Sequence, residues 1–339
     1  MKRTIVTLMF AAFATGAAAL TPLTDMGSQN YLGFPGGLYP GGRNEMPLDH
    51  AAAGMSFARE IMPRDPAGVP SSSGKVVLLS IGMSNTTQEF CSRGNSARCE
   101  MWSFVGQALA DPEVNRTSLV FANGAMGGQA AETWDSAGDS NYDRVRDTVL
   151  TPRGLSEAQV QVAWLKVANA RPTRSLPDGQ ADAYRLVTQI GDIARALRLR
   201  YPNLKIIYLS SRIYAGYATT MLNPEPYAYE SAFAVKWAVE AQIEQMRSGE
   251  VTNPRAGDLS YATAAPWMAW GPYLWADGLN PRSDGLVWEP GDFQSDGTHP
   301  SQSGEQKVGA LLLEFLKTEP TARGWFLDAA PARRRPARK

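Results

Sequence analysis

The chain has 339 residues, with 33 Lys and Arg against 33 Asp and Glu, so its formal net charge is zero. A balanced charge argues against a surface that binds nucleic acid or another polyanion, and the length allows one domain with a full hydrophobic core. With two histidines and two cysteines the chain offers almost nothing from which to build a Cys/His zinc site. We therefore expect neither a metal nor a cofactor.

Residues 1–19 predict a secretory signal. Lys2 and Arg3 precede an apolar, alanine-rich run, and Ala17 and Ala19 are suitably placed for cleavage after Ala19. An uncleaved membrane anchor is the alternative, because the apolar run is near the lower length limit for a membrane span. No stop-transfer cluster of charges flanks that run, so we expect a secreted or periplasmic protein without a membrane segment in its mature form.

Residues 20–73 are expected to form an extended N-terminal arm. The stretch "YLGFPGGLYPGGRNEMP" repeats Pro-Gly-Gly and shows neither a strand period nor a helix period. We expect this arm to run over the surface of a single domain at residues 74–327. Residues 328–339, which are rich in arginine, are expected to be a basic disordered tail.

From Lys75 onward, short β-rich runs alternate with amphipathic helices. The expected strands lie at residues 75–81, 118–123, 160–166 and 205–211. Apolar residues recur at helical spacing in residues 186–197, 235–246 and 308–315. This alternation predicts right-handed βαβ crossovers and an α/β fold, a three-layer sandwich in which helices cover both faces of a central parallel sheet.

The first expected strand opens abruptly into small polar residues. "KVVLLSI" is followed by "GMSNTTQEF", which places Ser84 at the carboxyl end of a buried strand. In open α/β sheets that end is where ligands bind. The simpler interpretation is a helix N-cap, since Ser, Asn and Thr are preferred caps and Gln88 or Glu89 could close a capping box.

Cys91 and Cys99 follow, separated by the short loop "CSRGNSARC". An exported chain meets an oxidising compartment, so we expect a disulfide, with two free thiols as the alternative. Closing so short a loop stabilises by roughly 2–3 kcal/mol at most. Its main effect would be to make the segment after Ser84 rigid.

The second and third strands end in candidate oxyanion donors. Gly127 and Gly128 would let a backbone N–H approach a substrate closely, although a glycine-rich turn into a helix is common. The spacing from Asn123 favours Gly128, and Gly127 stays open. Asn169 follows the third strand with an amide that could donate to the same oxyanion, or it is an ordinary turn residue.

The stretch "SDGTHPS" places Asp296 and His299 three residues apart, ahead of the last helix. A lone histidine near a helix start is more often structural, but the only other imidazole, His50, lies in the expected arm. The Asp296 carboxylate can reach Nδ1 through the turn, which leaves Nε2 as a base. Ser84 is its natural partner, because both loops open on the same edge of a parallel sheet.

Two long segments rich in Pro, Gly and aromatic residues follow strand ends, at residues 212–230 and 261–290. Loops of this length in a compact domain are usually functional. The second segment concentrates indole side chains: Trp267, Trp270, Trp275 and Trp288. These rings either bury the loop against the domain or form a cleft wall for a sugar or an acyl group.

In this order, Ser84, Gly128, Asn169 and the Asp296-x-x-His299 turn resemble the SGNH (GDSL-like) hydrolase family over residues 75–317. The nucleophile block reads Gly-Met-Ser here where the family usually has Gly-Asp-Ser. The resemblance implies a flavodoxin-like fold of the SGNH hydrolase type. It also implies that Ser84 is the nucleophile, that Asp296 and His299 complete the triad, and that Gly128 and Asn169 donate to the oxyanion together with the Ser84 backbone N–H.

The resemblance implies a secreted serine esterase that cleaves carboxylic esters, including O-acyl groups on carbohydrates, through an acyl-enzyme and without a cofactor. The expected partner is a small-molecule or glycan ester, and not nucleic acid. The candidate substrate contacts are Trp270, Trp275, Arg212 and Tyr214, with a surface arginine and a packed tyrosine as alternatives for the last two. An acyltransferase on the same scaffold and a non-catalytic glycan-binding module are the alternative functions.

Overall fold

The computed structural model of the chain describes residues 20–92 and 99–328. The expected signal at 1–19 and the tail beyond residue 328 therefore lie outside the described residues. The strands are β1 Asn30–Tyr31, β2 Phe34–Pro35, β3 Val76–Gly82, β4 Leu119–Asn123, β5 Val160–Lys166, β6 Ile206–Leu209 and β7 Trp267–Trp270. The α-helices are α1 Leu48–Arg59, α2 Ser84–Cys91, α3 Phe104–Ala110, α4 Ser140–Arg144, α5 Asp182–Arg200, α6 Tyr227–Ser248, α7 Gln302–Thr318 and α8 Pro320–Phe326, and a π-helical segment follows α4 at Val145–Leu150.

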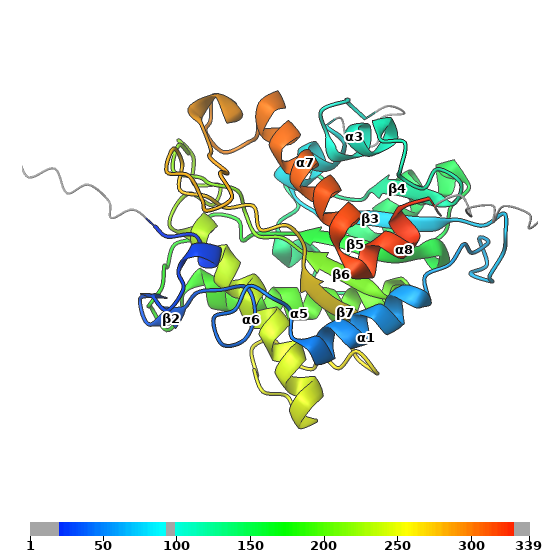
Figure 1. Cartoon of the computed structure of the whole chain (residues 1–339), viewed down its shortest axis with the longest axis horizontal. Helices are drawn as coiled ribbons and strands as arrows, with labels where there is room; N and C mark the ends of the chain where they lie inside the picture. The colour runs from blue at the N-terminus through cyan, green and yellow to red at the C-terminus, as the bar shows by residue number, and fades with distance from the viewer. Residues whose placement is uncertain (1–19, 93–98, 329–339) are drawn as a thin grey trace, which may run out of the picture.

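Five strands form one parallel sheet in the order β4-β3-β5-β6-β7 (Figure 1). This is the strand order 2-1-3-4-5 of flavodoxin-like folds, so the predicted α/β fold with a central parallel sheet is confirmed. Strands β3 to β6 lie where the sequence predicts them, whereas β7 falls in the tryptophan-rich segment that was expected to be a loop.

Helices cover both faces of the sheet, and β3 shows why. Val77, Leu79 and Ile81 are fully buried in the cluster that includes α5 and α6. Val76 and Leu78 are equally buried, but in the cluster that includes α3 and α7. Alternate side chains of a strand point to opposite faces, so a strand buried on both must be apolar throughout. Figure 1 shows the resulting layers, with α5 beside α6 and α7 beside α3 and α8.

The helices expected from periodicity are α5, α6 and α7. Helix α5 ends at Arg200, just before Pro202, which cannot continue a helix. Helix α6 ends at Ser248 and is followed by Gly249, whose φ of +81° is the left-handed conformation that favours glycine after a helix. The sequence signals for the ends of these helices therefore coincide with their observed ends.

Residues 20–73 are not an extended arm but part of the fold. They contain the β1–β2 hairpin and the helix α1, and Leu23, Met26 and Tyr39 are at most 4% exposed. On α6, Nζ of Lys236 donates to the carbonyl oxygen of Pro35 at 2.8 Å. The Pro-Gly-Gly repeats are turns that let the apolar residues between them reach the core. Because these turns interrupt any regular period, the sequence analysis did not predict this packing.

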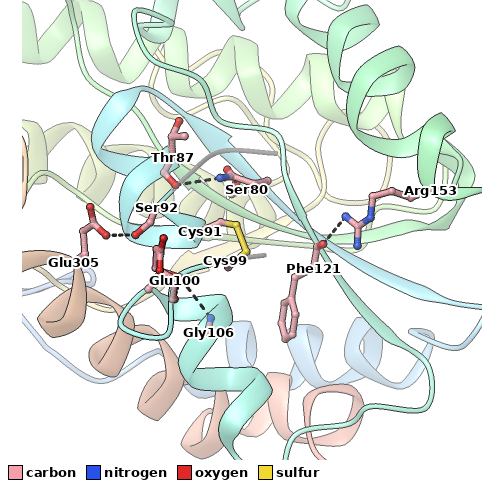
Figure 2. The surroundings of a disulfide bond; sticks show 12 residues. Ser80, Thr87, Cys91, Ser92, Cys99, Glu100, Gly106, Phe121, Arg153 and Glu305 are labelled. Atoms are coloured by element: carbon pink, nitrogen blue, oxygen red, sulfur yellow. Dashed lines mark hydrogen bonds between the residues drawn. A yellow bond between two sulfur atoms is a disulfide. The ribbon is translucent and has the colours of Figure 1, made fainter. Parts of the chain in front are cut away.

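Cys91 and Cys99 form the predicted disulfide, which Figure 2 shows at the end of α2. The segment 93–98 within the loop it closes lies outside the described residues. Beside the disulfide, Ser92 donates a hydrogen bond to Glu305 of α7 (Figure 2), and Nε1 of Trp102 donates to the same carboxylate at 2.7 Å. The end of α2 is therefore tied to the helix that follows His299. Across residues 20–92 and 99–328, no helix has both the length and the apolarity that a membrane crossing requires.

Candidate active site

Ser84 stands at the start of α2, directly after the central strand β3. Gly82 ends the strand with a φ of +156°, and a Cβ there would lie 2.1 Å from the carbonyl oxygen of Lys166, so no side chain fits. Met83 occupies the N-cap position of α2, and no side chain caps the helix. The N-cap interpretation of Ser84 is therefore wrong, and its hydroxyl is available for another partner.

That partner is His299, which lies 215 residues further along the chain. Its Nε2 is 2.8 Å from Oγ of Ser84, and its Nδ1 is 2.5 Å from Oδ2 of Asp296. The other carboxylate oxygen of Asp296 accepts from the backbone N–H groups of Thr298 at 2.9 Å and His299 at 3.0 Å. The structure thus brings the three residues expected from the sequence into one hydrogen-bonded chain.

The charge state of Asp296 supports this arrangement. Burial raises the pKa of its carboxyl, but the hydrogen bonds from the backbone N–H and the ring of His299, and from Thr298, outweigh burial and hold that pKa below its usual range. The carboxylate therefore stays ionised at neutral pH. It favours the imidazole tautomer with a proton on Nδ1, which leaves Nε2 to accept the hydroxyl proton of Ser84.

Two side chains of the "SNTT" stretch fix α2 in place. Nδ2 of Asn85 donates to the carbonyl oxygen of Thr298 at 3.0 Å, which joins the first turn of α2 to the loop of His299. Oγ1 of Thr86 donates to the carbonyl oxygen of Lys166 at 2.7 Å, which joins α2 to the end of β5. The small polar residues that were candidate caps therefore hold the serine and histidine loops together.

Below them lies a buried ion pair that the sequence analysis did not find. Nζ of Lys166 is 2.6 Å from both carboxylate oxygens of Glu89, and neither side chain is exposed. Burial raises the pKa of Glu89 and lowers that of Lys166 to about 8, and the short contact opposes both shifts. Each charge has lost its hydration, so removing either partner would leave an uncompensated charge in the core. While both partners are present, the pair holds α2 against β5.

Gly127 and Gly128 form a turn beside Ser84, closed by a hydrogen bond from the Gln129 N–H to the carbonyl oxygen of Met126 at 3.2 Å. Gly128 has a φ of +79°, which requires the freedom of glycine. A Cβ on Gly127 would lie 3.8 Å from Cβ of Ser84. Within the described residues, neither glycine N–H donates a hydrogen bond, so both are available to a ligand.

Asn169 also lies at this edge, with its carboxamide held by α5. Nδ2 donates to Oε1 of Gln189 at 2.7 Å. In the opposite orientation of the carboxamide, Nδ2 donates to the Asp182 carbonyl oxygen at 3.1 Å and Oδ1 accepts from Nε of Arg185 at 3.0 Å. In each case one N–H remains for a further acceptor, and a role in binding an oxyanion stays a prediction.

A pocket of about 360 Å³ opens over Ser84 and His299 at the carboxyl edge of the sheet. Five connecting segments contribute to the lining of this pocket: Met83, Ser84, Asn85, Gly127, Gly128, Ala130, Ala168, Asn169, Ala170, Arg212, Leu222, Asn223, Thr298 and His299. Leu222 and Asn223, from the 212–230 segment, were not singled out in the sequence analysis. Most of this lining is apolar or small, and among the described residues that form it Arg212 is the one cation.

The tryptophans expected to contact substrate do not line this pocket. Trp270 and Trp275 are at most 2% exposed, and their indole N–H groups donate to protein oxygens, the carbonyl of Leu38 at 2.6 Å and Oε1 of Glu225 at 2.7 Å. Trp270 belongs to the edge strand β7, whose side chains fill both faces of the core. The expected cleft wall is therefore packing, and the alternative interpretation holds for these residues.

Of the two remaining candidates, the structure brings only Arg212 to the pocket. Tyr214 is partly buried against the rings of Tyr217 and Trp275 and is absent from the pocket lining. Arg212 is 2% exposed, so it is not a surface arginine.

His50, the second imidazole, is remote from this chemistry. It lies on α1 with 3% exposure, stacks on Trp267 at 4.9 Å between ring centroids, and has Nε2 2.8 Å from the carbonyl oxygen of Met268. Burial lowers the pKa of His50 to about 4. His50 therefore belongs to the packing between α1 and β7.

No protein-family model matches the sequence, and no curated protein matches it. Among solved structures, a GDSL-like lipase from Parabacteroides merdae is 14% identical with a TM-score of 0.40, over 78% of this chain and 99% of that chain. A carbohydrate esterase family 2 enzyme from Corynascus thermopiles is 11% identical with a TM-score of 0.39, over 76% of this chain and 69% of that chain. A salicylyl-acyltransferase from a tetracycline biosynthetic pathway is 16% identical with a TM-score of 0.36, over 76% of this chain and 57% of that chain. The first match carries the name of the GDSL-like group that the sequence motifs resemble.

Proposed function

We propose that this chain is a serine esterase of the SGNH type that cleaves carboxylic esters through an acyl-enzyme on Ser84. One observation carries the proposal: Oγ of Ser84, the imidazole of His299 and the carboxylate of Asp296 form a hydrogen-bonded chain that faces a pocket. A glycan-binding module would need neither of these hydrogen bonds. A nucleophile, a base and a group that orients the base are what acyl transfer needs.

In the proposed reaction, Oγ of Ser84 attacks the ester carbonyl while Nε2 of His299 takes its proton. The C–O bond to the alcohol then breaks, and the imidazolium returns the proton to the leaving oxygen. A water molecule, deprotonated by the same Nε2, then attacks the acyl-enzyme. The C–O bond to Oγ of Ser84 breaks, the imidazolium returns the proton to Oγ, and the carboxylic acid is released. Asp296 stabilises the imidazolium in both halves of the reaction and is not itself protonated.

The developing oxyanion would face the backbone N–H of Ser84 and the Gly127–Gly128 turn. The first N–H groups of a helix have no partner within the helix, and the helix dipole favours negative charge there. Ser84 is the first residue of α2, and the two glycine N–H groups make no hydrogen bond within the described residues. These donors support the proposal because they are fixed before the substrate binds.

We further propose that the enzyme acts outside the cytoplasm on a small ester. The Cys91–Cys99 disulfide supports an oxidising compartment, and the pocket has room for one small molecule. The tryptophans that favoured a carbohydrate substrate are buried, so a carbohydrate ester needs other support.

The proposal is tested with 4-nitrophenyl acetate and a fluorophosphonate that reacts with activated serines. We expect hydrolysis of the ester, one adduct by intact mass, and peptide mapping that places this adduct on Ser84. The Ser84→Ala variant should neither hydrolyse the ester nor gain the adduct. Hydrolysis at the wild-type rate by a Ser84→Ala variant with a native circular dichroism spectrum would overturn the proposal.

A further inference from the structure

The side chain of Arg212 is a buried cation without a hydrogen-bonded partner in the part of the chain that the structure describes. It follows β6, is 2% exposed and lines the pocket that contains Ser84. Among residues 20–92 and 99–328, nothing accepts a hydrogen bond from its Nε or Nη2, and no carboxylate forms an ion pair with it. Buried charges in proteins are normally paired, because removing an ion from water is costly.

Three carboxylates interact electrostatically with Arg212, but each is already bonded to other donors. Glu89 accepts two hydrogen bonds from Lys166. Asp296 accepts from His299 and from two backbone N–H groups. Glu225 accepts from three N–H groups, which belong to Ala215, Tyr229 and Trp275. The fold therefore leaves the guanidinium without a direct counter-ion.

Asn223 places a second unpartnered polar group in the same pocket. It is 5% exposed and has a φ of +64°, a left-handed conformation that only a few non-glycine residues adopt. Its Nδ2 donates to the carbonyl oxygen of Asn169 at 3.4 Å, but its Oδ1 has no partner among the described residues.

We infer that the pocket takes esters that carry a carboxylate, which Arg212 binds, and that Oδ1 of Asn223 accepts from a hydroxyl next to that carboxylate. This inference rests on the proposed function, because it names the substrate class of the same site. The planar guanidinium matches a carboxylate with two parallel N–H donors. A pocket of about 360 Å³ holds a molecule the size of one sugar acid, so the ester at Ser84 and the carboxylate at Arg212 can belong to one substrate.

Two matched substrate pairs test the inference and distinguish where the carboxylate lies. O-acetylated glucuronic acid against its methyl ester places the charge in the alcohol part. The 4-nitrophenyl monoester of glutaric acid against 4-nitrophenyl valerate places it in the acyl part. A charge-assisted pair predicts that the acid in one of these pairs has a kcat/KM roughly tenfold to hundredfold above its neutral partner. Equal values in both pairs, or a preference for both neutral esters, would overturn the inference.

Variants at Arg212 show whether this residue is the cause. Arg212→Met should reduce the ratio of acid to neutral kcat/KM to about one, and Arg212→Lys, which keeps the charge without the planar fork, should give an intermediate ratio. Arg153→Met is the control for the loss of an arginine elsewhere in the fold. Arg153 is exposed, does not line the pocket and bonds the Phe121 carbonyl (Figure 2), so this variant should keep the wild-type ratio. A wild-type ratio in Arg212→Met would overturn the role of Arg212.

A binding measurement keeps the test independent of turnover and of the folding of the Arg212 variants. In the Ser84→Ala background, glucuronate should raise the Tm and its methyl ester should not. The two proposals can fail separately. Absence of 4-nitrophenyl acetate hydrolysis and of the fluorophosphonate adduct would overturn the esterase, whereas an active enzyme with equal kcat/KM on acids and neutral esters, and with no Tm response to glucuronate, would overturn only the carboxylate site.

Discussion

The two imidazoles of the protein lie in opposite surroundings. The side chain of His299 is 20% exposed, and both its nitrogens face side chains that can exchange or stabilise a proton. His50 is 3% exposed, stacks on Trp267 and meets only a backbone carbonyl. The comparison teaches that the two imidazoles differ in the partners of their ring nitrogens and in access to a pocket, and the proposed role of His299 rests on these differences.

The regions around these histidines differ in the same way. The carboxyl edge of the sheet presents small residues such as Gly127 and Ser84, which leave room for a ligand. The region of α1 and β7 is rich in indoles, and these fill the core. In this fold, aromatic density marks packing, and small polar residues after a strand mark the site.

The largest expected effect is the loss of kcat when the hydrogen-bonded chain of His299 is interrupted. Ser84→Ala and His299→Ala should each lower kcat on 4-nitrophenyl acetate by about 10⁴-fold or more, and the double variant should lose little beyond that, because the residues act as a unit. Asp296→Asn should cost somewhat less. The matched control is His50→Gln, whose folded fraction should keep the wild-type kcat. A fully active His299→Ala would show that the wrong base has been named.

The tryptophan region should respond in stability and not in kinetics. Trp270→Ala and Trp275→Ala should each lower the free energy of unfolding by about 3–5 kcal/mol, the range for truncating a large buried aromatic residue. Urea unfolding measures this change, and kcat/KM per folded molecule should stay at the wild-type value. An altered ester preference at unchanged stability would instead show that Trp270 and Trp275 contact the substrate.

Alanine substitutions at Gly127 and Gly128 should separate an effect on activity from an effect on stability. Gly128→Ala should lower the free energy of unfolding by about 1 kcal/mol, because alanine is strained at a φ of +79°. Gly127→Ala should leave stability nearly unchanged and lower kcat/KM several-fold, since its Cβ would lie 3.8 Å from Cβ of Ser84. Denaturation and steady-state kinetics on both variants check this, and the opposite assignment of the two effects would contradict it.

A further effect concerns pH and contrasts His50 with Glu230. Burial lowers the pKa of His50 to about 4, so between that pH and about 6.5 only the unfolded chain binds the proton, and stability falls as the pH is lowered through this window. Burial raises the pKa of Glu230 to about 7, so between about 4.3 and 7 only the folded chain holds the proton, and stability falls as the pH rises.

These opposing contributions overlap, so single variants should reveal each one. Glu230→Gln should leave a Tm that falls more steeply toward pH 4.5 than that of the wild type, and His50→Gln a Tm that falls more steeply toward pH 7.5. Each difference corresponds to on the order of 1–3 kcal/mol. Scans of Tm against pH measure both, and parallel profiles for the three proteins would contradict the assignment.

The sequence predicted those parts of the fold that rest on local pattern. Strands β3 to β6 are apolar and β-rich, and the loops of Ser84 and His299 share an edge because every strand of the sheet is parallel. The triad residues could therefore be placed together before any coordinates. The N-cap role of Ser84 could be excluded only from the observed start of α2, because the same residue types suit a cap and a nucleophile.

The rest depends on contacts between distant segments. Strand β7, "WMAW", has no β-branched residue and gains its strand form by pairing with β6. The burial of Trp275 and Arg212 depends on which segments cover them, and periodicity carries no such information. The sequence analysis did not predict helix α1, because the Pro-Gly-Gly turns before it suggested that all of residues 20–73 are irregular.

The packing of the N-terminal segment has a consequence for the time course of folding. The Leu23 N–H bonds the hydroxyl of Tyr273 at 3.1 Å, 250 residues away, and the hydroxyl of Tyr229 bonds the carbonyl oxygen of Thr21 at 2.7 Å. Thr21 and Leu23 thus find these partners only after α6 and the residues that follow β7 have left the ribosome. Contacts so distant in sequence form slowly, because a long loop must close before they are gained. The segment around residues 21–23 therefore cannot make these contacts until α6 and the segment after β7 have been synthesised, and we expect it to pack late in folding.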